Sequence, residues 1–320
     1  MTFYTMGLLG GIIGLAWGAD RFVDGASSLA ARLGISPLFI GLTLVSLGTS
    51  LPELLVTLTA TLSDLPDVAV GNVVGSNISN IALILGTTAL VRPLAIHSRL
   101  LARELPLLII ISGGFWLTAA SGEINRFEGL VLITGLMLFL VWMGRSAKTD
   151  SSDPVFTEAA QMVEGYHGTS TGSLTAVVAG VVALIAGSRL LVWGGVGIAH
   201  AFGVPELVIG LSLVALGTSL PELATTMAGA MKGEDDIAVG NIVGSNIFNC
   251  LAIIGIPAAI HPMTVHKTAL VRDFPVMMVL TLALWPIFYP FGRSGNGVVN
   301  RFEGFLLLAA YIIYISYLFS

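Results

Sequence analysis

The sequence has few charged residues and a single cysteine. Only 10% of its 320 residues are Asp, Glu, Lys or Arg, whereas a soluble domain carries roughly 25%. Because 55% of the residues are apolar and the mean hydropathy is +0.92, the composition excludes a soluble globular protein and predicts a membrane protein. Cys250 has no second cysteine with which to form an intramolecular disulfide. The net charge of −5 gives no indication of a nucleic-acid partner.

The chain contains an internal sequence repeat, with a shift of 169 residues between the two copies. GLTLVSLGTSLPE at 41–53 matches GLSLVALGTSLPE at 210–222, with 11 of 13 positions identical. AVGNVVGSNISN at 69–80 matches AVGNIVGSNIFN at 238–249, with 10 of 12 identical. The matches fall on Gly, Pro, Asn, Ser and Glu, so chance similarity between two apolar stretches does not explain them.

Each half contains five apolar segments of a length that can span a membrane. They are residues 4–31, 37–62, 68–91, 104–120 and 127–143, and then 173–201, 206–231, 237–260, 273–290 and 302–319. Because five is odd, the two halves enter the membrane in opposite directions. We therefore expect an all-α polytopic membrane protein of about ten transmembrane helices in two inverted five-helix repeats, with broken second and third helices. The repeats occupy 1–144 and 173–320, and the polar linker 145–172 between them is too short for a regulatory domain.

The positions of Lys and Arg indicate how the chain is oriented. With the N-terminus outside, nine of the 14 lie at inward ends or loops and three at outward ones, while Arg21 and Arg189 lie within the first helix of each half and are not counted. The inward residues are Arg32, Arg92, Arg99, Arg103, Arg145, Lys148, Lys232, Arg293 and Arg301, and the outward ones are Arg126, Lys267 and Arg272. This bias predicts a multi-pass protein of the cell inner membrane with both termini extracytoplasmic and the linker cytoplasmic. The first apolar run lacks a basic leader and a cleavage pattern, so we interpret it as the first span.

The repeated GTSLPE motif places a glutamate directly after a proline, at Glu53 and Glu222. Pro52 and Pro221 cannot donate a hydrogen bond to the carbonyl four residues back, so each frees backbone oxygens inside a helix. Such breaks are tolerated at membrane depth only where the freed groups face protein, a cavity or an ion. A protonated carboxyl or a kink needed only for packing is the alternative interpretation. Recurrence of the motif without a basic partner nearby favours a cluster of oxygens for a hard cation.

The second repeated motif forms a polar stripe on one helix face, because its polar residues recur every four positions. The stripe contains Asn72, Ser76 and Asn80 in the first half and Asn241, Ser245 and Asn249 in the second. Gly71 and Gly75 create a small face, for which close helix packing is the preferred interpretation. For the serines and for Asn80 and Asn249 we favour ion coordination. For Asn77 and Asn246, which lie off the stripe, a role in bridging helices is favoured at least as strongly.

These paired motifs resemble the two α-repeats of the cation/calcium exchanger superfamily, nearest to its prokaryotic sodium/calcium antiporter branch. The resemblance implies a secondary active antiporter that exchanges Na⁺ for Ca²⁺ by alternating access, as the first helix of each repeat slides across a rigid core. It implies a Ca²⁺ site made by the two glutamates and the carbonyls of the neighbouring threonines. By the same resemblance, the full set of metal-binding residues is Glu53, Glu222, Thr49, Thr218, Ser76, Ser245, Asn80, Asn249, Ser46 and Ala215.

One position departs from the family pattern, because many members have an aspartate where this chain has Asn249. Its counterpart Asn80 is also neutral, so the centre carries two carboxylates and a charge of −2. One Ca²⁺ balances that charge, and so do two Na⁺. The number of Na⁺ exchanged per Ca²⁺ therefore stays open, and any proton coupling would pass through Glu53 or Glu222.

Three other functions compete with Na⁺/Ca²⁺ exchange. A Ca²⁺/H⁺ antiporter of the same fold is the first alternative, although the Ser and Thr oxygens suit Na⁺. A cation channel is the second, but a buried site with two carboxylates binds too tightly for fast conduction. An enzyme is not expected, because the sequence has neither an HExxH nor a GxGD motif. We expect no cofactor, nucleic acid or protein partner, and take Ca²⁺ and Na⁺ as substrates in the lipid bilayer.

Overall fold

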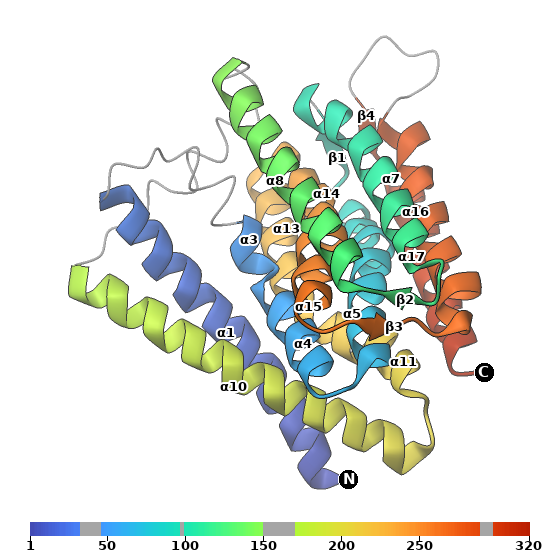
Figure 1. The fold of residues 1–320 in the computed structure, drawn as a ribbon. Coiled ribbons are helices and arrows are strands. Elements are labelled where there is room, and N and C mark those ends of the chain that lie inside the picture. Colours follow the sequence, from blue (N-terminus) through green and yellow to red (C-terminus); the bar gives the residue numbers. More distant parts are fainter. Residues whose placement is uncertain (33–45, 97–98, 150–169, 289–296) are drawn as a thin grey trace.

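Helices form almost the whole of the chain that the computed structural model describes, which is residues 1–32, 46–96, 99–149, 170–288 and 297–320 (Figure 1). The first half contains α1 (Thr2–Arg32), α3 (Ser46–Thr49), α4 (Leu51–Leu62), α5 (Pro66–Ile78), η2 (Ser79–Leu85), α6 (Gly86–Val91), α7 (Arg99–Ala119) and α8 (Arg126–Thr149). The second half contains α10 (Ser170–Phe202), α11 (Glu206–Ile209), η3 (Gly210–Val214), α12 (Ala215–Thr218), α13 (Leu220–Lys232), α14 (Asp235–Phe248), η4 (Asn249–Ile253), α15 (Gly255–Ile260), η5 (Ala269–Asp273), α16 (Phe274–Phe288) and α17 (Arg301–Leu318). The η elements are π-helical.

Seven helices in the described part of the chain are long and apolar enough to cross a membrane. A further pair, Glu206–Thr218 and Leu220–Lys232, passes the same test as one bent span, which raises the number to eight. Residues 37–45 of the expected second span lie outside the described residues. The chain is therefore a mostly helical, polytopic membrane protein.

The second helix of each half is broken, as the GTSLPE motif predicts. The breaks fall at Ser50 and Ser219, whose ψ angles of 6° and 9° leave the helical region. In the second half the two pieces are bent by 45°. Pro52 and Pro221 are the second residues of α4 and α13, where a missing N–H removes no helical hydrogen bond. Each proline thus lies in the first turn of the helix that follows the break.

The third helix of each half does not break, contrary to the prediction. From Pro66 to Val91 the chain is one span, and Ser79 and Gly86 keep right-handed helical dihedral angles. The motif at 69–80 contains no proline, so every residue in it keeps its backbone donor. A π-helical segment takes the place of the break, starting at Ser79 in the first half and at Asn249 in the second. Such segments are frequent at functional sites.

The two third helices form the core of the molecule. In the apolar 18-residue stretches of the Pro66–Val91 and Asp235–Ile260 spans, the buried share is 94% and 89%, whereas in those of the other five single-helix spans the share is 39% or less. Helices α1 and α10 lie side by side along the outside of this core and run obliquely to it (Figure 1). Gly75 packs directly on η3, because a Cβ atom there would lie 2.6 Å from the Leu211 carbonyl oxygen. This contact supports the packing interpretation of the small face.

Two small antiparallel sheets join the halves. Strand β1 (Leu94–Ile96) pairs with β4 (Gly297–Val299), and β2 (Glu123–Ile124) pairs with β3 (Met263–Thr264). Each sheet therefore takes one strand from each half. Both chain termini lie toward the lower side of the view in Figure 1, whereas α8 ends at the upper side.

Candidate functional site

Two buried glutamates occupy the first turns of α4 and α13. Glu53 and Glu222 are each 1% exposed. Ser219 Oγ donates a hydrogen bond to Glu53 Oε1, and Ser50 Oγ donates one to Glu222 Oε1, both at 2.9 Å. These are the serines at which the helices break, so the break in one half directs a donor at the carboxylate of the other. The two acidic side chains consequently belong to one site.

No basic side chain in the described part of the chain forms an ion pair with either glutamate. Each glutamate lies at the N-terminus of a helix, where the backbone N–H groups favour negative charge. Two buried carboxylates without a cationic partner are costly in a membrane unless a cation joins them.

Five buried oxygens of the expected site have no hydrogen-bond partner among the described residues. They are Glu53 Oε2, Glu222 Oε2, Ser76 Oγ, Asn80 Oδ1 and Asn249 Oδ1. Their elements contact one another, since α4 packs on α5 and η4 while α13 packs on α14 and η2. A buried oxygen without a donor costs about 1–3 kcal/mol. Two carboxylate oxygens and three neutral oxygens of this kind have the chemistry of a hard-cation site, which takes oxygen ligands.

The amide groups of Asn80 and Asn249 are oriented by two further asparagines. Asn80 Nδ2 donates to Asn246 Oδ1, and Asn249 Nδ2 donates to Asn77 Oδ1, each at 3.0 Å. Because the nitrogens are used in this way, the oxygens stay available as ligands. The helix-bridging interpretation of Asn77 and Asn246 agrees with these contacts between the halves.

The two orienting asparagines have different surroundings. Asn77 Nδ2 donates to Cys250 Sγ at 3.1 Å and to Met277 Sδ at 3.4 Å. Asn246 Nδ2 has no partner among the described residues. The two halves are therefore equivalent in the amide pairs but differ in the groups behind them.

Asn72 and Asn241, which the sequence places on the polar stripe, donate hydrogen bonds to the helices that follow the breaks. Asn72 Nδ2 donates to the Glu53 carbonyl at 3.3 Å and to Thr57 Oγ1 at 2.9 Å. Asn241 Nδ2 donates in the same way to the Glu222 carbonyl at 3.3 Å and to Thr226 Oγ1 at 3.0 Å. Their oxygens accept from the threonines of the opposite half, Thr218 at 3.1 Å and Thr49 at 3.5 Å. Sequence reasoning missed this role, although the spacing of 19 residues from each glutamate recurs in both halves.

The remaining expected residues are also found near the break points. Ser245 Oγ lies 3.2 Å from Ser50 Oγ. The Ala215 carbonyl accepts a hydrogen bond from the Ser219 N–H at 3.1 Å, and Thr218 Oγ1, whose single proton is shared with Asn72 Oδ1, lies 3.1 Å from the same oxygen. Ser46 begins α3, and its side chain lies outside what the structure describes. Sequence reasoning did not identify Ser50 and Ser219 as cross-half donors, although both stand three residues before a glutamate.

Comparisons with known proteins agree over the whole chain. The family described as Sodium/calcium exchanger protein matches residues 3–145 and 172–320. CaxA of Alkalimonas amylolytica, which is named as an antiporter by proposal only, is 46% identical, with 100% of this chain and 100% of that one covered. The inner membrane protein YrbG of Escherichia coli (strain K12) is 39% identical, with 100% of this chain and 98% of that one covered. The sodium/calcium exchanger MaX1 of Methanosarcina acetivorans is 31% identical, with 98% and 97% covered.

The fold is similar to a solved structure of the sodium-calcium exchanger NCX_Mj soaked with Na⁺ and Sr²⁺. The TM-score is 0.66 at 28% identity, with 98% of both chains covered. Family, relatives and fold match on both sides of the linker. This chain therefore belongs to the sodium/calcium exchanger family of membrane transporters and is not an enzyme.

Proposed function

We propose that the chain is a secondary active antiporter that exchanges Na⁺ for Ca²⁺ by alternating access. The observation that carries this proposal is a pair of buried carboxylates without a basic partner in the described chain, accompanied by three further buried oxygens that lack a donor. Ca²⁺ takes six to eight oxygen ligands in proteins, and both carboxylate and neutral oxygens serve.

We assign Ca²⁺ to Glu53 and Glu222 with the carbonyls of Thr49 and Thr218. Na⁺ uses the same glutamate and threonine in each half, together with one serine of the polar stripe and one backbone carbonyl. The Na⁺ ligands added in this way are Ser76 and the Ser46 carbonyl on one side, and Ser245 and the Ala215 carbonyl on the other, with Asn80 and Asn249 at the centre. Because both ions need the same two carboxylates, occupation by one excludes the other, which is the requirement for exchange.

The transport cycle in this proposal uses inverted repeats and ten spans. The reciprocal hydrogen bonds from Ser50 to Glu222 and from Ser219 to Glu53 support a two-fold relation between the halves. We place both termini outside the cell inner membrane and residues 145–172 in the cytoplasm. The paired helices α1 and α10 slide along the buried core and open the site to each side in turn.

Transport in proteoliposomes tests the proposal. With Na⁺ inside, uptake of labelled Ca²⁺ should follow the Na⁺ gradient in the unaltered protein. Glu53→Gln or Glu222→Gln removes half of the site's charge, so each should abolish uptake. The control is Glu123→Gln, an exposed carboxylate on β2, which should leave uptake unchanged.

The same vesicles distinguish the other candidate functions. Ca²⁺ uptake driven by a pH gradient in the absence of Na⁺ would replace the proposal with Ca²⁺/H⁺ antiport by the same fold. Single-channel currents would replace it with a cation channel. Uptake that both glutamine variants retain would remove the two carboxylates from the site.

A further inference from the structure

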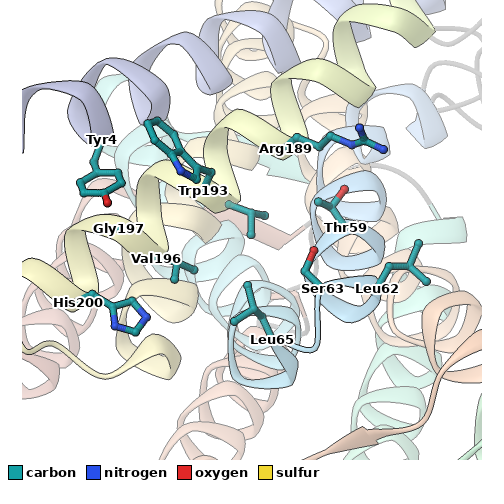
Figure 2. Close-up of a pocket in the computed structure, with 11 residues that line it drawn as sticks. Tyr4, Thr59, Leu62, Ser63, Leu65, Arg189, Trp193, Val196, Gly197 and His200 are labelled. Carbon is teal, nitrogen blue, oxygen red and sulfur yellow. The ribbon is translucent and has the colours of Figure 1, made fainter.

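A second polar feature lies away from the glutamates, in a cavity between α1, α4 and α10. Its volume is about 630 Å³, within the range of roughly 300–1,000 Å³ that is usual for small-ligand sites. Figure 2 shows Arg189 extending from α10 toward α4, beside Thr59, while His200 lies at the other end of the same face. Leu62 and Trp193 on the rim are 59% and 49% exposed, so the cavity opens at the outer surface of the bundle.

Arg189 is the unexplained group in this α4–α10 cavity. It lies one helical turn before Trp193 in the 31-residue apolar span Gly172–Phe202, and it forms no ion pair with the described residues. The contrast is with Arg21 on α1, whose guanidinium lies 5.7 Å from the centre of the Trp17 ring. An intramembrane arginine without a counter-charge is costly, and such residues normally mark a function.

The lining of the cavity indicates which class of ligand pairs with Arg189. No carboxylate is among the described residues that line it, so its charge disfavours cations and favours anions. Ser63 and Tyr4 add hydroxyl groups, while leucine and valine side chains form apolar walls. A guanidinium binds phosphate through two parallel hydrogen bonds. A ligand that combines an anionic group such as a phosphate with an apolar portion therefore fits the cavity.

The surroundings indicate the source of that phosphate. On α10 the apolar side chains Val182, Ile185 and Leu190 are exposed at the outer surface, which faces the acyl chains in a bilayer. Tyr4 and Trp193 pack with their ring centres 4.9 Å apart, and such aromatic residues gather at the headgroup level of membranes. We propose that the α4–α10 cavity binds the headgroup of an anionic membrane phospholipid, with Arg189 pairing with its phosphate.

The cavity joins two elements that also contact each other directly. Thr59 Oγ1 on α4 lies 3.0 Å from Ser188 Oγ on α10, next to Arg189. A lipid held here spans the same two helices. Bound lipid therefore stabilises the position of α10 against α4.

Tryptophan quenching by brominated lipid tests this site, because Trp193 lies on its rim. The protein is reconstituted in phosphatidylcholine vesicles that contain increasing low fractions of phosphatidylglycerol with brominated acyl chains. Trp17 and Trp285 are also exposed, so brominated lipid quenches them in every variant. We expect an additional saturable component of quenching that is lost in Trp193→Phe and has about tenfold weaker apparent affinity in Arg189→Gln. Arg21→Gln is the matched control and should behave like the unaltered protein.

The remaining arms of the experiment test the charge, the class of lipid and the source of the phosphate. Arg189→Lys keeps the charge and should retain most of the quenching, which separates loss of binding from misfolding of Arg189→Gln. Quenching that is equal in Arg189→Gln and the unaltered protein overturns the proposal. Equal quenching by brominated phosphatidylcholine overturns the anionic class of lipid. Displacement of the quenching lipid by inorganic phosphate overturns the assignment to a lipid headgroup.

Discussion

The asparagines Asn80 and Asn249 offer a matched pair of substitutions at the centre of the site. Replacing either by aspartate adds one carboxylate and removes one amide donor. Asn80→Asp removes the donor to Asn246 Oδ1, and Asn249→Asp removes the donor to Asn77 Oδ1. In each variant the neighbouring amide must rotate by half a turn, so that its NH₂ group faces the new carboxylate.

That rotation has a different cost in the two halves. At Asn77 it breaks the hydrogen bonds to Cys250 Sγ and Met277 Sδ. At Asn246 it supplies a partner to a nitrogen that has none among the described residues. Sulfur is a weak acceptor, and a buried hydrogen bond contributes about 0.5–1.5 kcal/mol. We therefore expect Asn249→Asp to be less stable than Asn80→Asp by about 1–2 kcal/mol.

Equilibrium unfolding with SDS in mixed micelles, at a fixed Na⁺ concentration, measures this difference. The cost of one additional buried charge is common to both variants and cancels in the comparison. In a Cys250→Ala background the difference should shrink, because one of the two sulfur acceptors is gone. Equal unfolding free energies for Asn80→Asp and Asn249→Asp, or the reverse order, would refute the reasoning.

Two other pairs related by the internal repeat give further predictions. Ser50→Ala and Ser219→Ala each remove the donor to the opposite carboxylate, so Ca²⁺ affinity measured by calorimetry should fall about tenfold in both; a change in one variant alone would contradict the reciprocal geometry. Asn72→Ala removes three buried hydrogen bonds, which at about 0.6 kcal/mol each in a membrane lowers the unfolding free energy by about 2 kcal/mol. Asn241→Ala should cost less, because its contact with Thr49 is 3.5 Å long; a larger loss than in Asn72→Ala would contradict this.

The parts of the site that follow from the repeat could be predicted from the sequence. Glu53 and Glu222 stand in identical motifs, each with a proline that directs a helix break, and the structure places both breaks within three residues of the glutamates. Asn80 and Asn249 follow from the four-residue stripe in the same way. In each case the chemistry of the residues gives a physical reason for the prediction, and the recurrence of the pattern in the second half makes the prediction specific.

Contacts between the halves could not be predicted in this way. The identity of the serine that meets each carboxylate depends on how two distant segments pack, and no local pattern contains that information. The π-helical segments at Ser79 and Asn249 have no proline or other local marker. The four strands are two or three residues long, which is too short for an alternating pattern to identify them.

The reciprocal serine–glutamate bonds have a consequence for the origin of the chain. In one half by itself the serine and the glutamate each lack the partner that the other half supplies, so that half is incomplete as a binding unit. Two copies of that half would complete both contacts without any covalent connection. The repeat in the sequence is therefore best explained by duplication of one half. Features found in only one copy, such as the sulfur acceptors behind Asn77, then arose when the two halves diverged after the duplication.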